Sequence, residues 1–233
     1  MVPSIKQLWK SVKELQGEIN LSSKELAELF AENLRTCKWE PHPLYSVFTQ
    51  YDQEYYLRRK EAFLHKYRCF YAVSKTISPK VILEMGTSAG SSADAYLSGT
   101  PGASYIGFDS FGIGTRHDDG SAWNPYEIAQ NLFESRGFKN HKLIRCDLRT
   151  LDKLPYKADF VVVDASHDFE NEYADLKLAL TADPTFIFVD DADDENGAKP
   201  AVEKFLKEDL KGKVTFTQSI EYQGGGMVIK INR

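Results

Sequence analysis

The stretch Glu84-Met85-Gly86-Thr87-Ser88-Ala89-Gly90-Ser91-Ser92 follows a short apolar run, Val81–Met85, and precedes a helical pattern. An apolar strand, a glycine-containing turn and a helix in this order are typical of the first βα unit of a nucleotide-binding sheet. Glycine lets the backbone approach a ligand closely, and a helix N-terminus attracts negative charge. A dinucleotide fingerprint needs a second glycine where this chain has Ser88, which disfavours a dinucleotide oxidoreductase. A turn that binds no ligand is the alternative.

Further apolar runs recur at intervals that leave room for helices. We expect strands, each apolar on both faces as in a buried parallel sheet, at 105–109, 142–146, 160–164 and 186–190. Asn124-Pro125 predicts a helix start between the second and third strands, because asparagine caps helices well and proline suits the first turn. This alternation predicts a doubly wound α/β sheet.

The two ends of the chain depart from this alternation. Two strand-like runs, 213–219 and 227–231, are joined by a link too short for a crossover, which predicts an antiparallel hairpin at the edge of the sheet. The first 62 residues are helical in pattern: Ile5 begins an amphipathic spacing, and Ser22-Ser23-Lys24-Glu25 is a capping box. We therefore divide the chain into an N-terminal helical extension, 1–62, and an α/β domain, 63–233.

Composition excludes several classes of protein. The chain has 233 residues with 34 acidic and 29 basic side chains and a formal charge of −5, which disfavours nucleic-acid binding. No apolar run approaches the roughly 18 residues that a membrane span needs. Cys37, Cys69 and Cys146 are widely spaced and form neither a disulfide framework nor a metal-binding pattern. A cytoplasmic location is the resulting expectation.

Acidic residues close the predicted strands, as they do in sheets that bind nucleosides. Asp109 ends the second strand, where a carboxylate can accept hydrogen bonds from both ribose hydroxyls, and Asp147 follows the third strand. Together with the glycine turn and the terminal hairpin, these positions resemble the class I S-adenosylmethionine-dependent methyltransferases over about residues 80 to 232. The resemblance implies a mostly parallel seven-stranded sheet. Its implied cofactor-binding residues are Glu84, Gly86, Gly90, Ser91, Ser92, Asp109, Asp147 and Asp164.

Three further carboxylates are expected at one edge of the sheet. Asp164 ends the fourth strand, and Asp190-Asp191 end the fifth. Clustered carboxylates repel one another unless a cation or protons offset their charge, and Mg²⁺ prefers oxygen ligands. We therefore expect a magnesium site formed by Asp164, Asp190 and Asp191. Helix capping by the Asp190-Asp191 pair is the alternative.

The sequence around these acids narrows the resemblance. Asp164-Ala165-Ser166-His167-Asp168-Phe169, followed by Phe188-Val189-Asp190-Asp191, is similar to the macrocin-type sugar O-methyltransferases and their small relatives. The resemblance implies that His167 is the catalytic base, with Asp168 as the second candidate. Capping or packing is the alternative role for His167. The chain departs from the branch at 181–185, which replaces a proline-glycine turn, and at Gly112-Ile113-Gly114, where an acid is common.

The expected function is a divalent-metal-assisted O-methyltransferase that acts on a small hydroxylated acceptor such as a sugar, a polyketide or a catechol-like molecule. A metal-independent enzyme that uses His167 alone, another reaction on the same scaffold, and a non-catalytic nucleoside-binding protein are the alternatives. The segment 116–123 mixes polar and aromatic residues and is either a lid or a plain surface loop. The family resemblance also implies a homo-oligomer.

Overall fold

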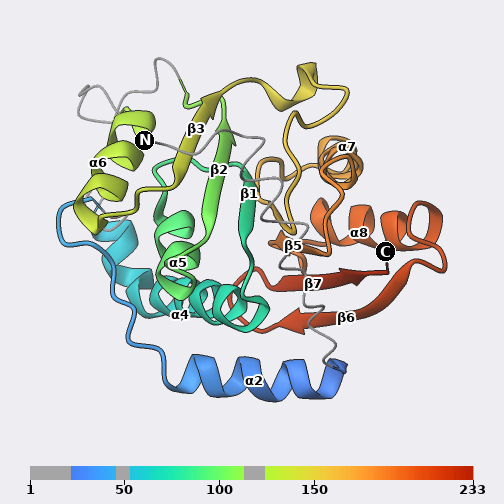
Figure 1. Ribbon diagram of the computed structural model, residues 1–233, viewed down its shortest axis with the longest axis horizontal. Helices are drawn as coiled ribbons and strands as arrows, with labels where there is room; N and C mark the ends of the chain where they lie inside the picture. Colours follow the sequence, from blue (N-terminus) through green and yellow to red (C-terminus); the bar gives the residue numbers. More distant parts are fainter. Residues whose placement is uncertain (1–21, 46–52, 113–123, 233) are drawn as a thin grey trace.

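The computed structural model describes residues 22–45, 53–112 and 124–232 (Figure 1). The amphipathic spacing that begins at Ile5 and the segment 116–123 lie outside the described residues. A seven-stranded sheet forms the centre of the molecule, with strand order β3-β2-β1-β4-β5-β7-β6. The strands are β1 (Val81–Met85), β2 (Ser104–Asp109), β3 (His141–Arg145), β4 (Phe160–Val163), β5 (Phe186–Asp190), β6 (Val214–Ile220) and β7 (Gly226–Ile231).

Strand direction confirms the predicted doubly wound, mostly parallel sheet. Strands β1 to β5 pair in parallel, and β7 runs antiparallel to both β5 and β6. The predicted terminal hairpin is therefore present, with β6 at the sheet edge. The strand order reverses between β1 and β4, and such a switch point is where open α/β sheets bind their ligands, at the carboxyl ends of the strands.

Helices cover both faces of the sheet (Figure 1). One face packs against α4 (Gln53–Ile77), α5 (Ser91–Gly99) and α6 (Pro125–Arg136), and the other packs against α7 (Phe169–Leu180) and α8 (Ala198–Glu208). Asn124 caps α6 through a hydrogen bond that its side chain accepts from the Glu127 N–H, as the Asn124-Pro125 pair predicts. A short 3₁₀ helix, η1 (Leu148–Thr150), follows β3.

Burial differs between the middle and the edge of the sheet. All residues of β4 and β5 are buried, which agrees with strands that are apolar on both faces. Strand β3 has no buried residue, so the expectation of a strand buried on both faces is wrong there. The reason is its position: among the described strands, β3 lies at the edge of the sheet and pairs only with β2.

The N-terminal part of the described chain packs against the sheet domain. Helix α2 (Ser23–Arg35) begins at the predicted capping box and lies against α4 and β6, below the sheet in Figure 1. A buried hydrogen bond, 2.9 Å from Asn33 Nδ2 to Thr76 Oγ1, joins α2 to α4. Helix α4 continues without a break across residue 62, and the domain boundary stays a prediction. Among the described helices, none combines the length and apolarity that crossing a bilayer needs.

Candidate active site

The turn between β1 and α5 is shaped by close contact with the end of β4. Gly86 has a φ of 97°, and a Cβ there would lie 1.9 Å from the carbonyl oxygen of Asp164. Gly90, with a φ of 80°, is the N-cap of α5 and faces Phe133, whose ring would be 3.1 Å from an added Cβ. At both positions the positive φ and the lack of space for a Cβ favour glycine. These glycines allow the loop backbone to reach the switch point.

Asp109 links this turn to the end of β2. Its Oδ2 accepts a hydrogen bond of 2.7 Å from the Ser88 N–H, and its Oδ1 accepts one from the Phe111 N–H. Each carboxylate oxygen keeps a second lone pair, which leaves the group able to accept further hydrogen bonds from a ligand. Asp109 thus sits at the strand end where the sequence predicts a ribose-binding carboxylate.

Glu84 lies beneath the turn and is fully buried. Burial raises the pKa of Glu84 to about 7, although hydrogen bonds from the hydroxyls of Tyr105 and Ser92 oppose that rise. Tyr105 donates its hydroxyl hydrogen to Glu84 Oε2. Glu84 therefore supports the turn from inside, and it lines neither of the two cavities described next.

Two neighbouring cavities open at the switch point. The larger, about 550 Å³, lies over the ends of β1 to β4, and the smaller, about 150 Å³, lies between the glycine turn and α4. Gly86, Ser88 and Asp164 line both. The larger cavity also contains the predicted residues Asp109, Asp147, His167 and Asp168. The smaller one contains Ser91 and Ser92, next to Phe63, Lys66, Tyr67 and Phe70 of α4.

Asp147 and Asp168 are exposed side chains that cap helices. Asp147 caps η1 and accepts hydrogen bonds of 2.8 and 2.7 Å from the Arg149 guanidinium, which lower its pKa. Asp168 caps α7, and hydrogen bonds from Asn171 lower its pKa. A carboxylate with a lowered pKa is a weaker base than an ordinary one. The capping roles are plain, and the predicted roles of both residues stay predictions.

His167 lies in the loop between β4 and α7, at the wall of the larger cavity. Its side chain is 62% exposed, and its Nδ1 is 3.9 Å from Asp191 Oδ2, too far for a direct hydrogen bond. The loop backbone is fixed from the other side, because a Cβ at Gly197 would lie 2.1 Å from the His167 carbonyl oxygen. The imidazole therefore extends from a closely packed loop and can contact a ligand in the cavity.

The three carboxylates that the sequence assigns to a metal lie around a lysine. Lys66 Nζ is 2.5 Å from Asp190 Oδ2 and 3.5 Å from Asp191 Oδ1. Burial and the Asp190 charge raise the pKa of Asp164 well above its usual range, and the same two causes raise the pKa of Asp191. Burial would lower the pKa of Lys66, but the surrounding carboxylates, Asp190 first, raise it overall.

This arrangement does not fit the predicted magnesium site. Both oxygens of Asp190 already have partners, since Oδ1 accepts a hydrogen bond of 2.6 Å from the Tyr222 hydroxyl and Oδ2 pairs with Lys66. In the described part of the chain, no group of three or more His, Cys, Asp or Glu side chains is placed to hold a metal ion. The residues present therefore give no support to Mg²⁺.

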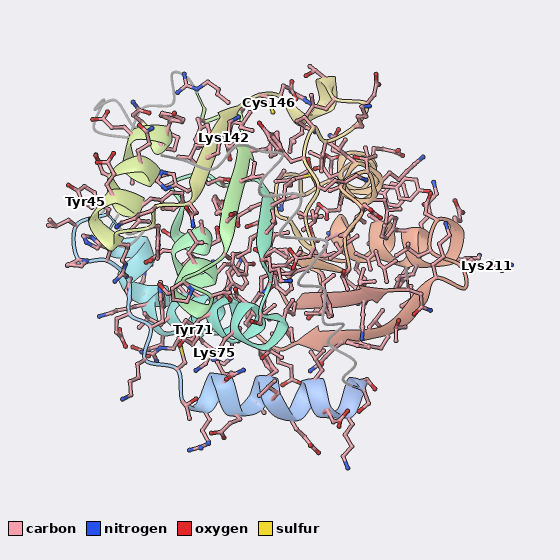
Figure 2. The ribbon with its side chains drawn as sticks, in the orientation of Figure 1. Tyr45, Tyr71, Lys75, Lys142, Cys146 and Lys211 are labelled. Carbon is pink, nitrogen blue, oxygen red and sulfur yellow. The ribbon has the colours of Figure 1, made fainter. Side chains whose placement is uncertain are left out.

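Several residues of the site carry no signal in the sequence pattern. Lys66 and Tyr222 reach the strand ends from α4 and from the β6–β7 connection, far away along the chain. Cys146, labelled near the upper end of β3 in Figure 2, is half-buried against the core and lines the larger cavity. Arg149, Ser166, Asn171 and Asp175 also line that cavity. The sequence pattern locates the strand ends, but it does not show that residues of α4 lie next to them.

Comparison with known proteins gives structural matches alone. No family model and no curated protein sequence matches the chain. The S-adenosylhomocysteine-bound methyltransferase PaMTH1 of Podospora anserina is 14% identical, with a TM-score of 0.54 over 100% of this chain and 99% of that one. The S-adenosylmethionine-bound O-methyltransferase TomG of Streptomyces achromogenes is 17% identical, with a TM-score of 0.50 over 99% and 100%.

Cofactor-bound Rv0187 from MTB is similar in the same way, at 13% identity and a TM-score of 0.50 over the full length of both chains. Identities this low compare folds and not activities. The sheet is seven-stranded and mostly parallel, with a single antiparallel strand between β5 and β6, as the family resemblance implies. The chain therefore has the Rossmann-like fold of the class I methyltransferases.

Proposed function

We propose that this chain is an S-adenosylmethionine-dependent methyltransferase that transfers the methyl group to a hydroxyl oxygen of a small molecule. The observation that carries the proposal is the pair of cavities at the switch point, which meet at Gly86, Ser88 and Asp164. The fold is shared with solved structures that hold this cofactor or its product, and TomG is named an O-methyltransferase, which favours an oxygen acceptor.

The two cavities suit the two halves of the cofactor. In the proposal the adenosine half lies in the larger cavity, where Asp109 accepts from the ribose hydroxyls and Asp147 from the adenine amino group. The methionine half lies in the smaller cavity, where Ser91 and Ser92 at the start of α5 meet its carboxylate, because helix N-termini favour anions. Glu84, Gly86 and Gly90 act by holding the turn in shape, and Asp164 faces the junction of the halves.

Methyl transfer from a sulfonium is an in-line displacement. The acceptor oxygen forms a bond to the methyl carbon while the carbon–sulfur bond breaks, which releases S-adenosylhomocysteine. The hydroxyl proton must leave, and a neutral imidazole is well suited to accept it near neutral pH. His167 takes this role in the proposal because it is exposed at the cavity wall. Asp168 is the weaker candidate, since its oxygens cap α7.

The acceptor class in the proposal is a hydroxylated small molecule such as a sugar, a polyketide or a catechol-like compound. The proposed reaction does not use the magnesium ion that the family resemblance implies, because Lys66 and Tyr222 already contact the two oxygens of Asp190. A homo-oligomer, a cytoplasmic location and the absence of a nucleic-acid partner stay predictions from the sequence.

Calorimetric titration with S-adenosylhomocysteine tests the cofactor site. We expect saturable micromolar binding to the wild type, at least tenfold weaker binding to Asp109→Asn, and unchanged binding to the exposed control Asp152→Ala. No binding to the wild type would refute the methyltransferase proposal.

A methyl-transfer assay against a panel of sugars, catechols and phenols separates an enzyme from a non-catalytic nucleoside-binding protein. With an acceptor that turns over, His167→Ala should lower the rate about 100-fold, within the usual range for a lost general base. Its affinity for S-adenosylhomocysteine should stay within about threefold. Equal rates for His167→Ala and the wild type would remove His167 as the base.

A further inference from the structure

The acidic strand ends surround a charged group that belongs to the chain itself. Lys66 extends from α4 over the end of β5, where its Nζ lies 2.5 Å from Asp190 Oδ2 and 3.5 Å from Asp191 Oδ1. The lysine side chain is 17% exposed and that of Asp190 is 1% exposed. The ion pair is therefore largely withdrawn from water, and removing one partner would leave an uncompensated buried charge.

Aromatic side chains hold the lysine in place. Nζ lies 5.6 Å from the ring centroids of both Phe70 and Tyr222, which are distances at which a cation is attracted to a ring face. Tyr222 also donates a hydrogen bond of 2.6 Å to Asp190 Oδ1. Tyr222 thus forms a hydrogen bond with one oxygen of Asp190, Lys66 forms an ion pair with the other, and the lysine and the tyrosine ring also contact each other.

An ammonium in this position competes with a metal ion for the same oxygens. Mg²⁺ and Mn²⁺ need carboxylate lone pairs at short distance, while an ammonium donates hydrogens to those lone pairs and offers none of its own. Its positive charge also repels a second cation. Asp164 faces the same space, since it lines the smaller cavity together with Lys66.

We propose that Lys66 is the resident cation of this site: its ammonium occupies the place of a divalent metal among Asp164, Asp190 and Asp191. The chain then binds its cofactor without a metal. On the function proposed above, on which this part of the inference rests, it also transfers the methyl group without one. Lys66 is a positioning residue in this scheme, because it acts by fixing Asp190 and Asp191.

Binding of Mn²⁺, followed by electron paramagnetic resonance of the free ion, tests the proposal without any need for activity. The proteins are the wild type, Lys66→Met, Lys66→Arg, Asp190→Asn, the double variant Lys66→Met/Asp190→Asn, and Lys75→Met. Lys75 is a matched control, because it lies on the same helix over the ring of Tyr71, 5.5 Å from its centroid, but is exposed (Figure 2). Thermal melts establish that each variant is folded.

The wild type, Lys66→Arg and Lys75→Met should show no saturable Mn²⁺ binding below about 1 mM. Lys66→Met should bind one Mn²⁺ at least tenfold more tightly than the wild type, and the added Asp190→Asn change should abolish that gain. Stoichiometric binding of Mn²⁺ to the wild type that Asp190→Asn removes would overturn the proposal, whatever the variants do. A folded Lys66→Met protein that gains no Mn²⁺ site would also overturn it.

A parallel titration keeps this proposal separate from the proposed function. Affinity of the wild type for S-adenosylhomocysteine should change less than twofold when a chelator is added. Loss of affinity on chelation would overturn the metal-free site. If S-adenosylhomocysteine binds under neither condition, the methyltransferase function fails, and the Mn²⁺ titrations still decide the role of Lys66.

Discussion

Strand β4 has an aspartate at each end, and the two carboxylates have opposite surroundings. Asp159, before the strand, accepts hydrogen bonds of 2.7 Å from the Val81 N–H and 2.9 Å from the Lys80 N–H. The carboxylate of Asp164, after the strand, accepts no hydrogen bond from any described residue. Burial, followed by the charge of Asp190, raises the pKa of Asp164. The amino end of the strand thus uses its carboxylate to join two strands, while the carboxyl end leaves its carboxylate available.

The difference extends across the sheet. At the carboxyl ends, Glu84, Asp164, Asp190 and Asp191 lie near the ammonium of Lys66. Such a concentration of partly satisfied charge destabilises the folded state, and the fully buried strands β4 and β5 stabilise it in compensation. Of these four, Asp164 lines both cavities, and a carboxylate with a raised pKa beside a cavity is the expected mark of a ligand site. Asp159 therefore stabilises the fold through its hydrogen bonds, whereas Asp164 faces the cavities in which we propose that the cofactor binds.

The largest effect is expected from a substitution that forces the ends of β1 and β4 apart. In Gly86→Ala the new Cβ would lie 1.9 Å from the Asp164 carbonyl oxygen, and the φ of 97° is unfavourable for alanine. Overpacking and backbone strain together should lower the free energy of unfolding by about 4 kcal/mol. Urea denaturation measures the loss.

Gly137→Ala is its matched control. Gly137 has a φ of 72° and no heavy atom within 4 Å of an added Cβ, so alanine there adds conformational strain alone. The expected loss is about 1 kcal/mol. Equal losses for the two variants would show that the contact with Asp164 does not contribute to the loss in the free energy of unfolding.

At the amino end, Asp159→Ala removes both hydrogen bonds that tie β4 to the start of β1. Two bonds to a charged, half-buried acceptor predict a loss of about 3 kcal/mol in the free energy of unfolding. Asp152→Ala, at an exposed position in the preceding loop, should stay within about 0.5 kcal/mol. Affinity for S-adenosylhomocysteine should be unchanged in both variants, and a loss confined to Asp159→Ala would place that residue in the binding site.

At the carboxyl end, burial should make stability depend on pH through Glu84. Its pKa is about 7 in the folded protein, against 4.5 for an exposed carboxyl. Because the folded state binds the proton more tightly, this stabilisation is complete at low pH and is lost as the pH rises from about 4.5 to 7. Between pH 5 and 7 the wild type should lose about 2 kcal/mol relative to Glu84→Gln. The exposed control Glu61→Gln should keep the wild-type slope, and parallel curves for Glu84→Gln and the wild type would contradict the burial effect.

The fold was predictable because its signals are local. Val81–Met85 is the first strand as expected, the capping box begins α2, and Asn124 caps α6. Each depends on residues within a few positions of one another. The exposure of β3 was not predictable in this way, because the edge of a sheet is decided by which strands pair and not by the strand's own residues.

The site was predictable only in part, for the same physical reason. Strand ends in a parallel sheet meet at one edge, so the acidic residues at the ends of β2, β4 and β5 were expected near one another. Nothing in the spacing within 53–77 distinguishes Lys66 from the other basic residues of α4, such as Lys75, whose ammonium lies over a ring and forms no ion pair with a described residue. Lys66 lies beside those acids because α4 packs on the sheet, and that packing depends on the whole fold.

The smallest expected effect tests how much one hydrogen bond contributes to stability at the carboxyl ends, where Asp190 also has an ion pair. Tyr222→Phe removes the hydroxyl that donates to Asp190 Oδ1 and keeps the ring beside Lys66. Asp190 keeps its ion pair with Lys66, so urea denaturation should show a loss of about 1.5 kcal/mol, half of that for Asp159→Ala. Tyr71→Phe, in which the ring under Lys75 is kept, should change stability by less than about 0.5 kcal/mol. A loss for Tyr222→Phe as large as that for Asp159→Ala would mean that Asp190 depends on its hydrogen bonds as much as the carboxylate at the amino end does, and the contrast between the two ends would then reduce to Asp164 alone.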